Sequence, residues 1–400
     1  YWDVEEVSSQ KTVLKMASLV DAGLIQAEIA GEGIARFSML EVIREYALKQ
    51  LRVAGDEEAY RQRHATYYAH LGERVALLQS GQGTSETQLV LELPNAGAAL
   101  QWVEERQKAE QGLRLAGFGW LWYSRGQISE AQRWLESILS LDMGTQEPAA
   151  LRVKLELLYG LGRIMLERGS LERAESLGKE ALKLAQGIGD QAGLSNALAN
   201  LGVVAQTRGK MEAAAIFFRE SYAAASQTGS PIIVSRALHH LADIAMAQGD
   251  IARATELLEE GLANVRAIGM GWGIAMITTP LGHLAREPQN YDLAKARYRE
   301  SLALLRTLRH TTYLAWSLEG FAASLIAEGH HAQATRLCAA AVTLRKRAQT
   351  PLPSAEGEAF DRTVTTARAA LDERTFAREW DAGTLLTQDE AIDDALSDAK

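Results

Sequence analysis

The chain has 400 residues, which is too long for one ordinary globular core and predicts two or three domains or an array of repeats. Apolar residues make up 47% and charged residues 23%, which excludes a chain disordered throughout, a collagen and a small disulfide-rich protein. With only 7 prolines it favours a mostly helical protein, and its net charge of −9 argues against broad non-specific binding to nucleic acid or an anionic membrane.

A single cysteine, Cys338, leaves no partner for an intrachain disulfide and fits a reducing compartment, so we expect a cytoplasmic protein. The sequence has no uninterrupted apolar run of 18 residues or more and no signal segment at its start. It begins with Tyr1 and not with methionine, so we expect a piece of a longer protein, whose further activities lie outside this piece.

The start of the chain predicts a small unit that contains both helices and strands. A helix is expected over 11–22, because its apolar residues recur at helical spacing. Strands are expected over 24–29 and 35–39 on either side of a tight turn at 31–33, followed by a helix over 40–53. This order of elements is that of the C-terminal part of a winged-helix domain.

Two further helices are expected over 56–79 and 86–106, joined through the Gly-Gln-Gly sequence at 81–83. They predict a helical linker between the winged-helix part and the rest of the chain. Four tryptophans gather where this linker meets the first repeat: Trp102, Trp120, Trp122 and Trp134. They predict an aromatic cap on the end of a helical array, or else a seam that rearranges on activation.

Three sets of residues recur every 40 positions in the second half of the chain. The first set is alanine: Ala174, Ala214, Ala254, Ala294 and Ala334. The second set is a small residue after a bulky apolar one: Gly162, Gly202, Ala242, Gly282 and Ala322. The third set is a glycine five residues before the alanine, which Gln289 interrupts: Gly169, Gly209, Gly249 and Gly329. An earlier, offset unit has the same pattern: Phe118, Gly119, Gly126 and Ala131.

These markers predict repeated helical hairpins. The small residue of the second set lets a neighbouring helix approach closely, and the glycine ends the first helix of the hairpin in a left-handed conformation. The recurring alanine is then the contact at which the second helix crosses the first. Between the markers the apolar spacing is helical. We therefore expect about six hairpins that stack into a solenoid.

The pattern resembles the tetratricopeptide repeat, most clearly in NALANLGVVAQTRGKMEAAAIFFRESYAAA. The usual period of that repeat is about 34 residues. A period of 40 resembles the variant with extended helices, and the resemblance covers roughly residues 113–345. It implies an all-α protein, a right-handed superhelix, whose concave face binds partners.

Other segments resemble bacterial STAND-type signalling ATPases. These segments are RFSMLEVIREYALKQL at 36–51, RQRHATYYAHL at 61–71 and the closing stretch at 367–396. The resemblance implies a sensor and regulatory arm that follows an ATPase module. The sequence has no Gly-x4-Gly-Lys-Ser/Thr phosphate loop, so we expect no catalysis and no cofactor in this chain, with ATP, ADP and Mg²⁺ confined to the missing module.

Four domains are predicted: a partial winged helix at 1–54, a helical linker at 55–110, a tetratricopeptide superhelix at 111–345 and capping helices at 346–400. The family resemblance implies that the winged helix acts as a clamp on the ATPase module. Two alternatives stay open. One is a DNA-binding transcription regulator that uses the winged helix, and the other is a static scaffold with no inducer. Lys11 and Lys15 are the only cations at 10–22, which makes a nucleic-acid partner a weaker prediction than a protein.

In many relatives of that family a Met-His-Asp sequence starts the last winged-helix helix, and its histidine contacts bound ADP. Met39, Leu40 and Glu41 stand at the matching positions. Leucine cannot donate a hydrogen bond to phosphate, so no direct nucleotide contact is expected here. Arg36 and Arg44 are candidates for contact with the neighbouring ATPase domain.

The histidine pairs and the single cysteine are predicted to have structural roles. His239-His240 and His330-His331 are the only histidine pairs, and no further ligands with metal-site spacing accompany them, so no metal is expected. Cys338 follows the repeat alanine by four residues, where a core residue is expected.

The concave face carries the candidate binding residues. If the first helix of each hairpin lines this face, as the family resemblance implies, twelve side chains lie on or near it: Trp120, Tyr123, Tyr159, Arg163, Asn196, Asn200, Arg236, His239, Asp243, His283, Arg286 and Trp316. Their mix of aromatic, amide and charged groups suits a protein or peptide ligand, or a small-molecule inducer. Asn196, Asn200 and Arg236 faintly resemble the arrays that clamp a peptide carboxylate, although the lysines of those arrays are missing.

Overall fold

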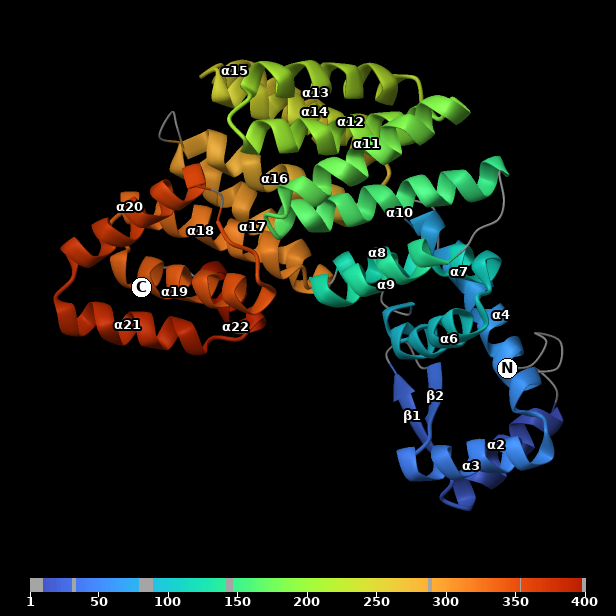
Figure 1. Cartoon of the computed structure of the whole chain (residues 1–400). Helices are drawn as coiled ribbons and strands as arrows, with labels where there is room; N and C mark the ends of the chain where they lie inside the picture. Colours follow the sequence, from blue (N-terminus) through green and yellow to red (C-terminus); the bar gives the residue numbers. More distant parts are fainter. Residues whose placement is uncertain are drawn as a thin grey trace.

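The computed structural model describes residues 10–30, 34–78, 89–124, 126–141, 147–286, 290–352 and 354–397. Helices dominate this part of the chain, and the only sheet described is a two-stranded hairpin (Figure 1). The predicted turns at 31–33 and 81–83 and the interruption at Gln289 lie outside the described residues.

The N-terminal unit has the predicted order of elements. These are α2 (Gln10–Asp21), β1 (Gln26–Ala30), β2 (Ile34–Ser38) and α3 (Glu41–Ala54). The two strands are antiparallel, with Gln26 opposite Ser38. Gly55, at φ 78°, ends α3 in the left-handed conformation that glycine adopts without strain. No residue of α3 is buried, so this helix packs only weakly against the rest of the chain.

The linker region contains three helices that pack together: α4 (Glu57–Leu78), α6 (Leu93–Arg106) and α7 (Ala109–Leu115). The expected helix over 86–106 is interrupted: residues 89–90 are helical, a turn follows at 91–92, and α6 begins at Leu93. Pro94 stands in the first turn of α6, where the missing N–H of proline costs no hydrogen bond. The proline therefore marks the start of α6, which the apolar pattern placed too early.

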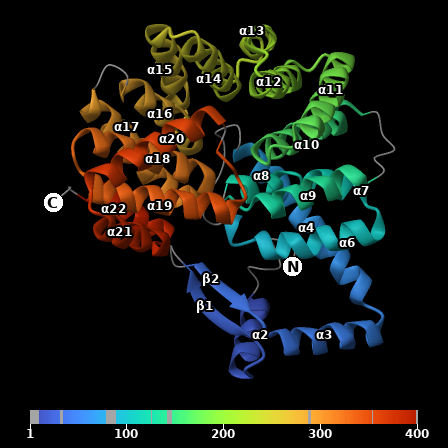
Figure 2. The ribbon, with the colours of Figure 1, turned by 60° about the vertical axis from the view of Figure 1, so that its left-hand side comes forward.

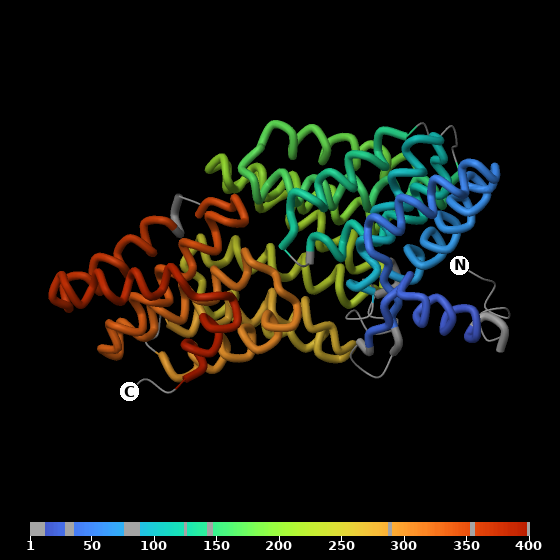
Figure 3. The backbone as a smooth tube through the Cα atoms, turned by 90° about the horizontal axis from the view of Figure 1, so that it is seen from below, coloured from blue at the N-terminus to red at the C-terminus, as the bar shows by residue number. Residues whose placement is uncertain are grey.

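Helical hairpins make up the rest of the chain and stack one after another. Their helices are α8 (Gly117–Ser124), α9 (Ile128–Ser140), α10 (Pro148–Glu167), α11 (Leu171–Ile188), α12 (Gln191–Thr207), α13 (Met211–Ser226), α14 (Pro231–Ala247), α15 (Ile251–Ala267), α16 (Gly271–Arg286), α17 (Tyr291–Leu308), α18 (Thr311–Ala327) and α19 (His331–Ala348). The chain closes with α20 (Ser354–Ala370), α21 (Glu373–Leu385) and α22 (Gln388–Leu396). In a view from below these last helices lie at the opposite end of the molecule from the N-terminal unit (Figure 3).

The structure confirms the physical meaning of the repeat markers. The marker glycines that end the first helices all have positive φ, between 71° at Gly169 and 87° at Gly329. The marker alanines are fully buried. A Cβ added to Gly202 would lie 2.3 Å from the Phe218 ring, and one added to Gly282 would lie 2.7 Å from Tyr298. Glycine at these positions therefore lets the two helices of a hairpin touch.

A second turn also recurs every 40 residues, at the ends of the second helices. Its members all have positive φ: Gly189, Gly229, Gly269, Arg309 and Gln349. Glycine occupies the first three positions, and arginine and glutamine adopt the same left-handed geometry in the last two. From α10 onward, the described turns at both ends of these hairpins thus contain a left-handed residue.

The stack of hairpins curves until its two ends meet. Figure 2 shows the helices following one another from α8 and α9, over α12 to α15, to α18 and α19 beside the start. A Cβ added to Gly126, after α8, would lie 2.8 Å from the backbone nitrogen of Thr311 at the start of α18. Gln388 of the C-terminal helices also donates a hydrogen bond to the Thr311 hydroxyl, at 3.0 Å. The superhelix is therefore closed at this seam.

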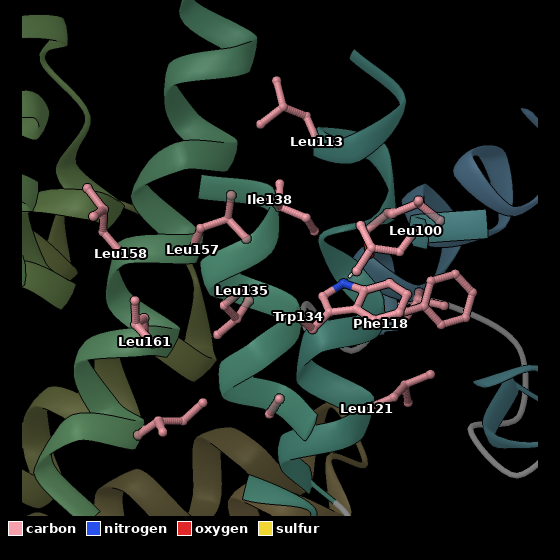
Figure 4. Packing of buried hydrophobic residues seen from close by; sticks show 14 of the residues in the cluster. Leu100, Leu113, Phe118, Leu121, Trp134, Leu135, Ile138, Leu157, Leu158 and Leu161 are labelled. Carbon is pink, nitrogen blue, oxygen red and sulfur yellow. Dashed lines mark hydrogen bonds between the residues drawn. The ribbon is translucent and has the colours of Figure 1, made fainter. Parts of the chain in front are cut away.

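An apolar core caps the N-terminal end of the stack. Trp102 and Trp134 are only 2% and 3% exposed within it, and Trp120 and Trp122 pack against it. Trp134 lies beside Phe118, with their rings 6.1 Å apart, and it donates a hydrogen bond to the carbonyl of Leu115 (Figure 4). The predicted aromatic cap is thus present where linker and hairpins meet.

Candidate binding site on the inner face of the superhelix

Successive first helices are joined on their inner side by a ladder of polar contacts. The amide nitrogen of Asn200 on α12 donates to the carbonyl of Tyr159 on α10, at 3.2 Å. Arg236 on α14 donates to the amide oxygen of Asn196 on α12, at 3.1 Å, and its guanidinium lies 4.7 Å from the centre of the Tyr159 ring. Asn196 and Asn200 are nearly fully buried. The repeat period of 40 residues brings these side chains together, because one helix turn recurs at the same level in each hairpin.

Two histidines and an aspartate continue the ladder along α14. The rings of His239 and His240 are stacked, and Nε2 of His239 and Nδ1 of His240 lie 3.7 Å and 3.4 Å from the Asp243 carboxylate. Burial lowers the pKa of His239 to about 4 and that of His240 to about 3. Burial also raises the pKa of Asp243, against the attraction of His239. Both histidines are therefore neutral near pH 7. The His240 contact with Asp243 is a hydrogen bond of an uncharged ring, whereas the His239 contact is longer than a hydrogen bond.

Four aromatic rings meet at the seam, one from the first hairpin and three from two neighbouring hairpins near the end of the stack. The His310 ring lies 5.3 Å from Tyr123, 4.6 Å from Trp272 and 5.2 Å from Tyr313. Tyr123 and Trp272 are also in edge contact, at 6.3 Å. These residues come from α8, α16 and the start of α18, so closure of the superhelix is what assembles them. We call Tyr123, Trp272, His310 and Tyr313 the seam cluster.

Arg163 and Glu167 of α10 lie next to the seam cluster. The Tyr123 hydroxyl donates a hydrogen bond to Glu167. Burial lowers the pKa of Arg163, but the fields of Tyr123 and Glu167, with those of two other tyrosines, outweigh that effect and raise it. Burial raises the pKa of Glu167, and Arg163 opposes this rise. The two side chains are thus close enough to feel one another electrostatically.

A third group lies further along the inner side, on α16 to α18. Nδ1 of His283 is 2.9 Å from the Tyr298 hydroxyl, and the His283 ring lies 5.1 Å from Trp316. Trp316 contacts Tyr313 of the seam cluster at 5.7 Å, which connects the group to the rest of the site. Burial lowers the pKa of His283 to about 3, with a smaller contribution from Arg286.

The structure thus places eleven of the twelve predicted residues in three groups on the inner side, joined by direct contacts and, for Arg163 and Arg286, by electrostatic interactions. Trp120 is the exception, because it packs against the N-terminal core. Glu167, Trp272, His310 and Tyr313 were not predicted. Glu167 lies one turn beyond Arg163 on the same helix, and His310 occupies the helix-start position that Asp190 and Ser230 hold in earlier repeats. That register could have identified both, whereas Trp272 and Tyr123 meet only because the superhelix closes.

A cleft lies elsewhere, between the linker helices. It has a volume of about 520 Å³ and is lined chiefly by arginine and glutamate side chains from α3, α4 and α6. Arg52 pairs with Glu57 at 2.7 Å, and Arg106 pairs with Glu58 at 2.7 Å. Its charged side chains therefore pair with one another, which leaves little unpaired charge for a ligand.

Other predicted residues occupy ordinary structural positions. Cys338 is fully buried, and burial raises the pKa of its thiol to about 12, so it is unreactive at neutral pH. Within the described ranges no three His, Cys, Asp or Glu side chains are grouped so that they could hold a metal ion. The helices that the structure describes include none long and apolar enough to cross a membrane.

Comparison with known proteins identifies the repeat. Residues 154–227 match the tetratricopeptide repeat family, and this segment contains most of α10 and all of α11, α12 and α13. The same markers continue on both sides of this segment, and the described marker glycines keep their left-handed or close-packed geometry there. The chain is therefore an all-α solenoid of tetratricopeptide-type hairpins, the architecture of modules that bind proteins.

Curated relatives include proteins of Mycobacterium bovis and Mycobacterium tuberculosis named as HTH-type transcriptional regulators. They are 27% identical over 193 residues, which is 46% of this chain. The chain spans about a fifth of their length, since 21% of each relative is covered.

Similar solved structures include a Rap protein in complex with competence and sporulation factor, with 12% identity and a TM-score of 0.48. That match covers 84% of this chain and 97% of the Rap chain. Another is a STAND protein with a tetratricopeptide repeat sensor from Pyrococcus horikoshii, with 15% identity and a TM-score of 0.45. It covers 92% of this chain and 57% of that chain.

Proposed function

We propose that the chain is the non-catalytic sensor and regulatory arm of a STAND-type signal-transduction ATPase. In this proposal the inner side of the superhelix binds a protein, a peptide or a small inducer. We call the polar ladder, the seam cluster and the His283–Trp316 group together the inner array. The observation that carries the proposal is this array, which runs from Tyr159 to Trp316 and combines aromatic rings, amides and charges in a fold of protein-binding modules. A cytoplasmic location belongs to the same proposal.

The N-terminal unit supports the link to a further domain. Its described helices and strands expose large apolar side chains that a free surface would not favour: Val13, Leu14, Phe37, Leu40, Val42, Tyr46 and Val53. A surface of this kind suits burial against another protein domain. We propose that the ATPase module of the same full-length protein covers it, and that ATP, ADP and Mg²⁺ bind in that module.

The proposed switch works through the relation between arm and module. A ligand on the inner array favours the arrangement of arm and ATPase module in which the array is best formed. It shifts the balance between two arrangements only by the difference in its affinity for them. The closed seam provides such a difference, because any widening of the superhelix separates Tyr123 from Trp272 and His310.

Affinity capture from host lysate tests this proposal. The bait is the chain itself, compared with an Arg236→Ala/Asp243→Ala variant of the inner array. A matched control, Arg219→Ala/Glu220→Ala, alters two exposed charges on α13. The proposal predicts a partner or small molecule that is lost with the inner variant and kept with the control. Equal capture by all three baits would contradict it.

A further inference from the structure

The seam is held by a different kind of contact from the rest of the stack. Neighbouring hairpins share clusters of buried apolar residues, of which one extends from α4 to α12 and another from α16 to α22. Within the described ranges none of these clusters joins α8 or α9 to α16–α22. The seam is formed instead by the approach of Gly126 to Thr311 and by ring contacts of Tyr123 with His310 and Trp272. Because apolar burial is the main stabilising term, the seam should open at a lower free energy than a boundary between neighbouring hairpins.

The closed seam also leaves two buried polar atoms without a partner among the described residues. These atoms are Oε2 of Glu167 and Nε2 of His310. The other oxygen of Glu167 accepts a hydrogen bond from Tyr123, and Nδ1 of His310 accepts one from the backbone N–H of Tyr313 at 3.4 Å. A buried polar atom that lacks a partner costs free energy, which water restores once the atom becomes accessible. The closed form therefore carries a cost that an open form does not.

The same seam covers the inner array. Burial raises the pKa of Tyr313 on α18 to about 12; Arg163 of α10 opposes this rise, and Glu167 of α10 and Asp243 of α14 add to it. The inner faces of α10, α14 and α18 thus lie close enough to interact electrostatically. Asn200 and Tyr313 are only 1% and 9% exposed. A ligand therefore reaches this part of the array only when the seam opens.

Each side of the seam is a cohesive unit. On one side α8 and α9 belong to the apolar cap, in which the rings of Phe118 and Trp134 lie 6.1 Å apart. On the other side the buried pair of Glu319 and Arg345 joins α18 to α19. Opening is therefore expected at the seam itself, through small changes of angle between successive hairpins that add up along the stack.

We infer that the seam is a gate: α18 separates from α8 and α10 to admit a ligand to the inner array, and closure of the seam retains the ligand. This inference rests on the proposed function and specifies how access to its site is regulated. The free protein is mainly closed and has a minor open form. A ligand that binds the closed array better than the open one shifts the balance towards closure.

A matched pair of glycine substitutions tests the gate. Gly126 and Gly169 both have a positive φ, 67° and 71°, so alanine is similarly strained at either position. An added Cβ at Gly126 would lie 2.8 Å from the backbone nitrogen of Thr311, whereas at Gly169 it would meet no atom within 4 Å. Gly126→Ala therefore places a wedge in the seam, and Gly169→Ala is its control.

Spin labels report the distance across the seam. They are attached through Arg133→Cys on α9 and Lys346→Cys on α19, two exposed positions, while the native Cys338 is fully buried and stays unlabelled. Gly126→Ala should raise the fraction of molecules at the longer distance at least about tenfold, because the wedge penalises only the closed form. Gly169→Ala should keep the distance distribution of the parent protein.

A second seam variant introduces no backbone strain. Trp272→Leu removes the ring contact with Tyr123 across the seam, at 6.3 Å, and should also raise the fraction of molecules at the longer distance. Circular dichroism shows whether each variant is folded. If the wedge variant does not fold, Trp272→Leu decides the test.

An unchanged distance distribution in the folded seam variants would overturn the inference. Equal changes in Gly126→Ala and Gly169→Ala would overturn it as well, because they would trace the effect to backbone strain and not to the seam. These measurements use no ligand, so their failure is distinguishable from a failure of the capture experiment, which tests the proposed function.

Discussion

One buried ion pair fixes the packing of α18 on α19. Arg345 and Glu319 are 9% and 8% exposed, and the guanidinium makes two hydrogen bonds to the carboxylate, at 2.5 Å and 2.8 Å. Two charges in such a place stabilise the fold only as long as both are present, because either one alone would be buried without compensation.

Replacement of Glu319 by alanine should therefore destabilise the protein strongly. We expect a loss of about 3–5 kcal/mol in the free energy of unfolding, measured by urea denaturation. Glu256→Ala serves as the control, since Glu256 pairs with Arg253 on the exposed surface of α15 and should contribute almost nothing. A similar effect of the two substitutions would show that the ion pair does not anchor α19.

At this scale the sequence identified most residues of the candidate site but not their arrangement. The register of the first helices identified Tyr159, Asn196 and Arg236, because residues 40 positions apart share a face. It could not identify the seam cluster, since the contact of Tyr123 with Trp272 depends on the summed curvature of several hairpins.

At the scale of the hairpin, the close approach of its two helices depends on one glycine. A methyl group at Gly202 would meet the Phe218 ring, so Gly202→Ala should destabilise the protein by about 1–3 kcal/mol. Gly187→Ala is the matched control: Gly187 is exposed in α11, with no atom within 4 Å of an added Cβ, so alanine there should stabilise by up to about 1 kcal/mol. Thermal melts of both variants measure these two changes. Stabilisation by both substitutions would contradict the close packing of Gly202 against Phe218.

The N-terminal hairpin is held to the linker by one arginine. Arg36 of β2 donates to the Glu92 carboxylate at 2.7 Å and to the carbonyl of Leu91 at 3.0 Å. Glu92 is itself held by hydrogen bonds from Tyr68 and Asn95. Arg36 is thus the contact that would restrict movement of the N-terminal unit about Gly55.

Removal of this contact should loosen the unit. In an Arg36→Met variant, spin labels at the exposed positions Ser38 and Gln101 should report a broader distance distribution than in the parent protein. Arg44→Met is the control, because Arg44 bonds only to Glu41 on its own helix among the described residues. An unchanged distribution in the Arg36 variant would show that other contacts hold the unit.

The order of the elements could be predicted from the sequence, and their ends less well. Every expected helix and strand of the N-terminal unit and linker is present, with ends that differ by a few residues. The second left-handed turn was missed because arginine and glutamine replace glycine at two of its five positions, Arg309 and Gln349. A turn that tolerates other residues leaves a shorter and weaker run of glycines to detect.

For the whole molecule, buried histidines make stability depend on pH. The folded-state pKa is about 4 for His239 and about 3 for His240, His283 and His310, whereas an unfolded histidine titrates near 6.5. Between these values the unfolded chain binds more protons, so stability is complete above about pH 7 and is lost as the pH falls. Each histidine should contribute about 1.4 kcal/mol per pH unit below about pH 6.

Urea denaturation between pH 5.5 and 7.5 measures this dependence. The loss of unfolding free energy on acidification should be smaller in a His240→Gln variant, by the contribution of one histidine. Glutamine at this position takes up no proton when the chain unfolds. Asp243 and Glu167, whose pKa values burial raises, act in the opposite direction at lower pH, and the variant comparison removes their contribution. A flat profile, or one unchanged by the substitution, would contradict neutral buried histidines.

The central claim is that a ligand binds inside the closed superhelix. Hydrogen–deuterium exchange of the chain, with and without the partner or inducer obtained by capture, tests this claim most directly. Our account predicts slower exchange in α10, α12 and α14 and at the start of α18, where Arg163, Asn200, Arg236 and His310 lie. Slower exchange confined to the second helices α11, α13 and α15, with the first helices unchanged, would contradict it.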